Sequence, residues 1–268
     1  MALLQELLLL TFVLLECSPC YVSTSNTTDH GTLMLFKSHV SMDPSGAQVQ
    51  WGNLSIPMCQ WPGVACGLKG SHLGRVVALN LTNLNLVGTI TTALGNLTYL
   101  RLLDLSLNHF HGIMQPELGN LRDLETPVLG HNSIQRYISP SLMNCSHLVV
   151  ISLYGNMIQG EIPSEVSSLH NLAYLYLDEN RLTGKIPSSI GSLVSLKVLV
   201  LQFNNLTREI PTEIGSIVNL THLSLGFNQL TGTIPASLGN LSAMEQLPPP
   251  HPLLLLATSR WTERWKKC

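Results

Sequence analysis

The stretch LDENRLTGKIP at residues 177–187 recurs almost unchanged as LGFNQLTGTIP at residues 225–235. Asparagines follow the same spacing along the chain, 24 residues apart and without insertions: Asn108, Asn132, Asn156, Asn180, Asn204 and Asn228. An interval held this strictly indicates one structural unit that is repeated, rather than a set of separate sites.

Around each asparagine lies the frame L-x-x-L-x-L-x-x-N-x-L-x-G-x-I-P. The fifth copy fills it with Leu172, Leu175, Leu177, Asn180, Leu182, Gly184, Ile186 and Pro187. This is the leucine-rich-repeat signature. The alternating L-x-L predicts a short strand whose leucines face an interior that only stacked coils can close. The predicted fold is an α/β leucine-rich-repeat solenoid, a right-handed horseshoe with a parallel β-sheet on its concave face.

The other frame residues have structural roles. A buried asparagine side chain has two N–H donors and an acceptor, so we expect the asparagine column to satisfy backbone groups where each coil leaves its strand. Gly and Pro are expected to bend the chain. Arg136 and Arg208 replace the glycine in two coils. Pro127 occupies a strand position without an N–H, so the third coil should be the least regular.

The repeat defines the predicted domain boundaries. Seven coils are expected over residues 76–247, with Leu84 in place of the first asparagine. One interval further on, Pro249 and Pro252 occupy the leucine and asparagine positions. Residues 248–268 are therefore interpreted as an irregular tail, which is either a truncation or an intron-derived end.

Composition favours the secretory pathway. Charged residues make up 11% of the chain and the net charge is −2, which does not favour nucleic acid as a partner. The apolar runs at 7–15 and 253–257 are too short to span a bilayer. The first run predicts a signal peptide over residues 1–20, and hence a secreted or extracellular protein.

Two cysteines lie just before the first coil. In a secreted chain, the spacing of Cys59 and Cys66 favours a disulfide over a metal site. Cys145 occupies a leucine position and is expected to be a buried free thiol.

Residues 28–66 are expected to cap the solenoid. Leu33, Phe36 and Val40 fall on one helical face, Asp29 can cap the helix start, and the turn from Asp43 onwards should end the helix. This helix should cover the leucines of the first coil.

Several motifs in this region resemble a known family. F-K-S-H-V, D-P-S-G and C-x-W-x-G-V-x-C resemble the N-terminal cap of plant leucine-rich-repeat receptor-like kinases. R-V-V-A-L-N-L at 75–81 and the L-T-G-x-I-P coils extend the resemblance over residues 28–247. The most similar group contains immune receptors for microbial peptides. The resemblance implies an extracellular ligand-binding ectodomain for defence or developmental signalling, without the membrane helix and kinase of full-length members.

Acceptor motifs for N-glycosylation are numerous and support export. They are centred on Asn26, Asn53, Asn80, Asn96, Asn144, Asn205, Asn219 and Asn240. Part of this number follows from the repeat itself, because Asn96 and Asn240 hold the same coil position.

No enzyme motif is present, so neither catalytic residues nor cofactors are expected. His109, His111 and His131 are close in sequence but are better explained as loop histidines than as metal ligands. The alternative to a receptor ectodomain is a secreted inhibitor of a cell-wall-degrading enzyme, because plant polygalacturonase inhibitors have a similar scaffold. Those inhibitors end in a cysteine-stapled cap, which this sequence lacks.

The outward-facing strand positions predict a binding surface for a peptide or protein ligand, and for a co-receptor ectodomain as a possible second partner. These positions can vary without disturbing the leucine core, and aromatic residues among them suit binding. Ordinary solvated strand residues are the competing interpretation. The predicted concave-face residues are Tyr154, Tyr174, Tyr176, Asp178, Lys197, Gln202, Phe203, His222 and Phe227.

Overall fold

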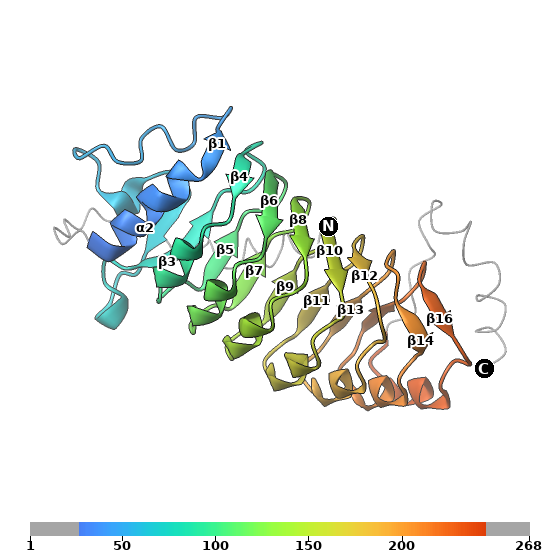
Figure 1. The fold of residues 1–268 in the computed structure, drawn as a ribbon. Helices are drawn as coiled ribbons and strands as arrows, with labels where there is room; N and C mark the ends of the chain where they lie inside the picture. The colour runs from blue at the N-terminus through green and yellow to red at the C-terminus, as the bar shows by residue number, and fades with distance from the viewer. Residues whose placement is uncertain (1–26, 245–268) are drawn as a thin grey trace.

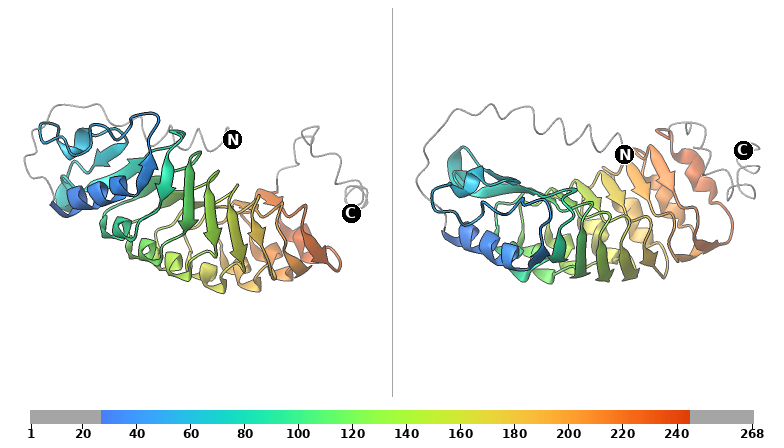
Figure 2. Two further views of the ribbon diagram at one scale, coloured as in Figure 1. Left: turned by 45° about the horizontal axis from the view of Figure 1, so that its top comes forward. Right: turned by 90° about the horizontal axis from the view of Figure 1, so that it is seen from above.

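In the computed structural model, which describes residues 27–244, each repeat forms one coil with three sides (Figure 1). The first side is a strand of a continuous sheet, the second a short outer strand, and the third a 3-10 helix. The coils stack into an open arc with the short helices along one side (Figure 2). The predicted fold class is confirmed.

The L-x-L segments form an eight-stranded sheet, which we call the concave sheet. Its seven strands from β3 onwards are parallel, and β2 pairs antiparallel with β3 at one edge. Leu175 in β11 pairs with Ile151 and Leu199, so neighbouring strands are in register at the repeat interval. The strands are β2 (Val64–Cys66), β3 (Val76–Asn80), β5 (Leu102–Asp104), β7 (Thr126–Val128), β9 (Val150–Ser152), β11 (Tyr174–Tyr176), β13 (Val198–Val200) and β15 (His222–Ser224).

The outer strands form a second, lateral sheet in the order β1, β4, β6, β8, β10, β12, and β14 pairs with β16. These strands are β1 (Val40–Met42), β4 (Val87–Thr89), β6 (His109–Ile113), β8 (Ser133–Arg136), β10 (Met157–Gly160), β12 (Arg181–Leu182), β14 (Thr207–Glu209) and β16 (Gln229–Thr231). The 3-10 helices are η1 (Met58–Gln60), η2 (Gly70–His72), η3 (Thr92–Asn96), η4 (Pro116–Asn120), η5 (Pro140–Asn144), η6 (Ser164–Ser168), η7 (Ser188–Ser192), η8 (Thr212–Ser216) and η9 (Ala236–Asn240).

The asparagine column satisfies backbone groups as predicted. The Nδ2 group of Asn180 donates to the carbonyl oxygens of Leu153 at 2.9 Å and Asp178 at 3.0 Å. Its Oδ1 accepts from the amide of Ile158 at 3.0 Å. Each asparagine therefore links its own coil to the preceding one. The first coil, which has Leu84 instead, receives the same support from Asn108, whose Oδ1 accepts from the Leu84 amide at 3.1 Å.

The third coil is irregular at Pro127, as expected. Neighbouring parallel strands of the concave sheet otherwise pair through three residues each, whereas β7 and β9 pair only through Val128 and Ser152. Proline lacks the N–H that this ladder needs. The two glycine replacements also have a structural cost: Arg136 and Arg208 adopt positive φ angles of 65° and 68°. This left-handed region disfavours residues that carry a Cβ.

The cap contains the helix α2 (Thr27–Ser38), which covers the first coil in Figure 1. Phe36 is fully buried, with its ring centroid 5.8 Å from that of Phe110 in β6. The prediction placed Val40 on the helix and the helix end near Asp43, and both were wrong. Val40 begins β1 and pairs with Gly88 of β4, so a long-range strand contact ends the helix at Ser38.

Asp29 also differs from its predicted role as a cap at the helix start. It lies inside the first turn of α2 and is fully buried. Its carboxylate accepts hydrogen bonds from Arg75 Nε at 3.0 Å, Arg75 Nη2 at 2.9 Å and the Val76 amide at 2.9 Å. The guanidinium of Arg75 lies 4.4 Å from the centre of the Tyr99 ring. Asp29 therefore ties the cap to the first coil.

The predicted disulfide between Cys59 and Cys66 is confirmed, with the two Cα atoms 5.4 Å apart. Beside it, the rings of Trp51 and Trp61 stack with centroids 5.7 Å apart. Cys145 is a buried free thiol, as expected, and burial raises its pKa to about 11. Within residues 27–244, no helix combines the length and apolarity needed to cross a membrane. The predicted signal peptide over 1–20 and the tail over 248–268 lie outside the described residues.

Candidate ligand-binding surface

The solvent-facing side of the concave sheet is most aromatic at β11. Tyr174 and Tyr176 alternate with the buried Leu175, so both rings lie on the concave side. Their neighbours in register are Val150 and Ser152 on β9, together with Val198 and Val200 on β13. Burial raises the pKa of Tyr176 to about 12, so its hydroxyl is protonated at neutral pH.

Phe203 and Phe227 form an exposed aromatic pair where successive coils leave the sheet. Their rings stack with centroids 4.1 Å apart and planes inclined by 12°. The side chains remain 41% and 39% exposed. Both residues have a φ of 54°, in the left-handed region that a Cβ disfavours. The coil geometry therefore presents two large apolar rings to solvent despite a local backbone cost.

Tyr154 and His131 occupy the space that two glycines leave free. A Cβ at Gly130 would lie 2.4 Å from Cε1 of Tyr154, so the tyrosine ring takes the place of the missing side chain. A Cβ at Gly155 would likewise lie 2.6 Å from Nδ1 of His131. The His131 and Tyr154 rings meet edge to face with centroids 4.7 Å apart. The glycines of coils three and four thus position this ring pair.

Asp178 belongs to a polar chain across three coils. Ser224 Oγ donates to Gln202 Oε1 at 2.8 Å, and the Gln202 side chain forms a hydrogen bond with the Asp178 carboxylate. The pKa of Asp178 is raised to about 6, first by burial and then by the neighbouring Glu179. The amide of Asp178, His131 and Gln202 act in the opposite direction.

Not all nine predicted residues lie together. Lys197 precedes β13 and His222 begins β15, so both lie at the amino ends of the strands. Asp178, Gln202, Phe203 and Phe227 follow the carboxyl ends of theirs. The structure therefore divides the predicted set into a main group around β11 and the strand ends, and a separate pair at the opposite edge.

Three residues of this surface were missed as binding candidates. Ser152, Ser224 and His131 lie on the concave side, next to predicted residues. A signal for them was present, because each lies a multiple of the repeat interval from a predicted residue: Ser152 and Ser224 from Tyr176, and His131 from Phe203.

The structure places seven of the eight predicted glycosylation acceptors, and Asn26 lies outside the described residues. Asn80 is half-buried on β3, facing the concave side. Asn219 donates its Nδ2 to the Val194 carbonyl at 2.8 Å, a bond that a glycan on this atom would disturb. The exposed acceptors are Asn53, Asn96, Asn144, Asn205, Asn219 and Asn240. Their occupancy stays a prediction.

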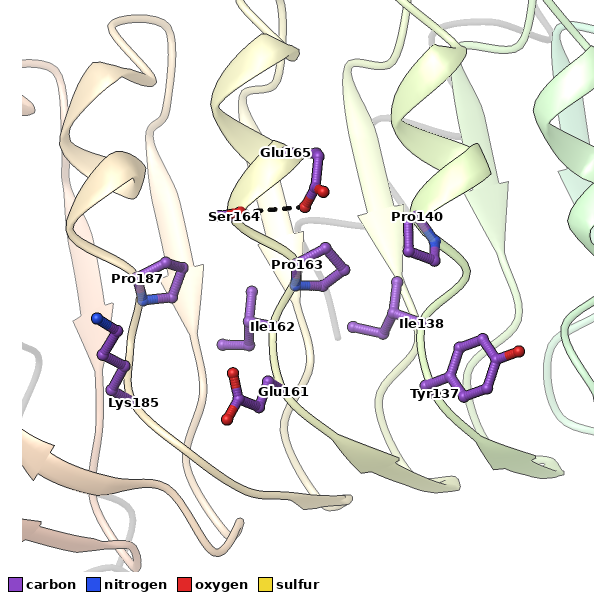
Figure 3. Close-up of a pocket in the computed structure, with 10 residues that line it drawn as sticks. All are labelled: Tyr137, Ile138, Pro140, Glu161, Ile162, Pro163, Ser164, Glu165, Lys185 and Pro187. Carbon is purple, nitrogen blue, oxygen red and sulfur yellow. Dashed lines mark hydrogen bonds between the residues drawn. The ribbon is translucent and has the colours of Figure 1, made fainter.

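A shallow groove of about 510 Å³ lies between the lateral sheet and the 3-10 helices (Figure 3). Its walls include the exposed Tyr137, the charged Glu161 and Lys185, and the prolines Pro163 and Pro187. The groove contains none of the nine predicted residues. Within residues 27–244, no cluster of His, Cys, Asp or Glu could hold a metal ion.

Family models match both parts of the chain. The model for the leucine rich repeat N-terminal domain matches residues 26–67, and the model for the leucine-rich repeat region matches residues 128–251. Among curated proteins, the LRR receptor-like serine/threonine-protein kinase EFR of Arabidopsis thaliana is 41% identical over 101 residues. That segment is 38% of this chain and 10% of the relative, so the chain spans only a small part of it.

Solved structures of plant proteins are similar to this chain over a larger share of its length. The PEPR1–AtPEP1 complex has a TM-score of 0.76 and 34% identity, covering 82% of this chain and 31% of that one. The plant peptide hormone receptor RGFR1 in complex with RGF2 has a TM-score of 0.59 and 39% identity, covering 60% and 26%. The Arabidopsis receptor kinase HAESA with the peptide hormone IDA and the co-receptor SERK1 has a TM-score of 0.53 and 26% identity, covering 82% and 45%. The chain therefore combines a leucine rich repeat N-terminal domain with a leucine-rich repeat region, and over these parts it is similar to the ectodomains of plant leucine-rich-repeat receptor kinases.

Proposed function

We propose that this chain is the ligand-recognising part of an extracellular receptor-type protein, and that a peptide or small protein lies across the concave side of coils four to seven. The observation that carries the proposal is the stacked pair Phe203 and Phe227, which is exposed just after the carboxyl ends of β13 and β15. Large aromatic groups dominate the energetics of protein recognition sites.

The architecture suits recognition rather than catalysis. The leucine and asparagine columns carry the folding energy, so the concave side chains are free to serve a ligand. Tyr176 lies between Ser152 and Val200 on a sheet fixed on both sides, which pre-organises its ring. A rigid aromatic surface loses little entropy on binding.

The structural relatives support a peptide as the ligand. RGFR1 is described as a plant peptide hormone receptor in complex with RGF2, and HAESA as a receptor kinase in complex with the peptide hormone IDA. The complex with SERK1 makes a co-receptor ectodomain a reasonable second partner. We place the chain outside the cell, in defence or developmental signalling.

The test begins with the full chain, secreted from plant cells and immobilised. Peptides are selected on it from a phage-displayed random dodecapeptide library, and one selected peptide is measured by calorimetry. We expect the double variant Tyr176→Ala with Phe203→Ala to weaken binding at least tenfold, about 1.4 kcal/mol. The matched control is Tyr137→Ala, which removes an exposed tyrosine from the lateral groove and should leave affinity unchanged.

Unchanged affinity in the double variant, with circular dichroism showing an intact fold, would rule out this surface. The alternative function is a secreted inhibitor of cell-wall-degrading enzymes. It predicts that the chain slows a panel of fungal polygalacturonases, whereas a receptor ectodomain should not.

A further inference from the structure

Two buried polar atoms on the concave side lack a hydrogen-bond partner among the described residues. They are Ser152 Oγ and Asp178 Oδ1. Ser152 is completely buried, and it alternates with the core residues Ile151 and Leu153, so its hydroxyl points away from the leucine core. A buried polar atom without a partner is costly and marks a place where a polar contact is missing.

These atoms belong to a quartet of side chains. Ser152 pairs in register with Tyr176, and Tyr154 holds the same coil position as Asp178, one repeat earlier. Neighbouring strands are about 4.8 Å apart, and residues two apart on one strand about 7 Å. Ser152, Tyr154, Tyr176 and Asp178 therefore form the corners of one small area, with two aromatic rings and two unpaired oxygens.

The charge around this quartet is negative. Asp178 is followed by the exposed Glu179, and the fully buried Asp104 acts on the same Tyr154 hydroxyl as both of them. Within residues 27–244, no lysine or arginine forms an ion pair with any of these three acids. The titratable groups that face Asp178 are Glu179, His131, Tyr154 and Tyr176.

We propose that this quartet binds the cationic nitrogen of a lysine or arginine side chain in the ligand. An ammonium or guanidinium group has several N–H donors and no acceptor, so it can satisfy Asp178 Oδ1 and Ser152 Oγ together. The faces of the tyrosine rings attract a cation. Because both oxygens are shielded in this structure, entry requires a change of side-chain rotamer at the quartet.

The inference rests on the proposed function, because it names the chemistry of the ligand group that the concave surface selects. Neutral and anionic groups would not serve. A neutral apolar group would leave both oxygens unpaired, and an anion would be repelled by Asp178, Glu179 and Asp104.

In the test, the full chain selects peptides from the random dodecapeptide library near neutral pH, and the selected peptides are sequenced. We expect lysine or arginine to be enriched at least tenfold at one position of the aligned peptides. The same selection on Asp178→Asn should still yield peptides but lose this enrichment. Glu161→Gln, an acid in the lateral groove, is the matched control and should keep it.

Calorimetry then measures the contribution of the contact between Asp178 and the cationic residue of the peptide. Replacing the enriched residue of a selected peptide by norleucine removes the charge and should weaken binding about tenfold in the native chain. The two peptides should bind equally to Asp178→Asn. Affinity for the cationic peptide should also fall as the pH drops through about 6, where Asp178 becomes protonated and loses its charge. In Asp178→Asn this part of the pH dependence should be absent, which separates it from the contribution of any other titratable group.

The inference would be overturned if the selected peptides showed no preference for lysine or arginine. It would also be overturned if the norleucine replacement still weakened binding to Asp178→Asn. Either result would leave the proposed function standing. Failure to select any peptide would overturn the proposed function, and this inference with it.

Discussion

The first and the last coils of this solenoid have the same leucine frame but bury it to different extents. In the first coil, Leu79 and Leu81 are almost completely buried beneath the cap. In coil seven, the equivalent residues Leu223 and Leu225 are only partly buried, and Leu230 is as well. Within the described residues, β15 is the terminal strand of the concave sheet.

The difference shows that the burial of a leucine in this repeat depends on whether a neighbouring coil covers it, and not on its position in the frame alone. Leu201 and Leu225 hold the same frame position, yet Leu201 is fully buried because coil seven covers it. A coil cannot bury its own face, so stability arises at the interfaces between coils. The cap residues Phe36 and Asp29 close the first coil by providing such an interface.

The largest effect should come from opening the cap. Phe36→Ala removes a fully buried ring that lies against Phe110 and Trp51, and should lower the free energy of unfolding by about 3–5 kcal/mol. Urea unfolding followed by tryptophan fluorescence measures it. Leu35→Ala, on the same helix but 53% exposed, is the control, with an expected change of about 0.5 kcal/mol or less. Similar losses in both variants would mean that α2 does not close the core.

Breaking the polar contact of the cap should have the next largest effect. Asp29→Asn keeps the shape but removes the charge that pairs with Arg75, and should lower the free energy of unfolding by about 3–4 kcal/mol. The control is Asp123→Asn, which alters an exposed pair with His72 and should change stability by less than about 1 kcal/mol. Equal unfolding midpoints for the two variants would show that the buried pair does not bind the cap to the first coil.

Substitutions of the frame leucines in coils six and seven allow a direct comparison of a fully buried leucine with a partly buried one. Leu201→Ala should cost about 3 kcal/mol, because a cavity remains in a closed core. Leu225→Ala should cost only about 1–2 kcal/mol, because its side chain is already partly in contact with solvent. Chemical denaturation of the two variants gives the difference. Equal costs would contradict the view that coil seven is less well covered.

The smallest effect concerns backbone strain near the open end. Arg208→Gly should raise stability by about 0.5 kcal/mol, because glycine adopts the observed φ of 68° without a Cβ clash. Thermal unfolding followed by circular dichroism shows whether the substitution raises or lowers stability. Arg181→Gly is the control: Arg181 has no left-handed φ, so this change should destabilise the chain. A loss of stability in Arg208→Gly would mean that its side chain matters more than the strain.

Features that depend on local spacing could be predicted from the sequence. The asparagine column, the disulfide between Cys59 and Cys66, and the break at Pro127 each follow from residue type and interval. The end of the cap helix could not be predicted in this way. Val40 has a favourable helical spacing, but its pairing with Gly88 across the chain outweighs that local preference.

The candidate site is predictable in position but not in detail. Alternation places Tyr174 and Tyr176 on the concave side, and the repeat places Phe203 beside Phe227. The contact of Tyr154 with His131 depends on missing side chains in neighbouring coils, which the spacing of aromatic residues does not reveal.

The sequence by itself therefore determined the period, the strand positions and the identity of the residues on the concave side, because a fixed interval of stacked coils places equivalent residues side by side. Only the tertiary structure decided which of these side chains lie together and how deeply. Burial of Asp178 among tyrosines from two coils raises its pKa to about 6, and Ser152 is sealed beneath the same surface without a partner among the described residues. Both properties depend on the packing of neighbouring coils, because desolvation is set by surrounding atoms and not by the residue itself.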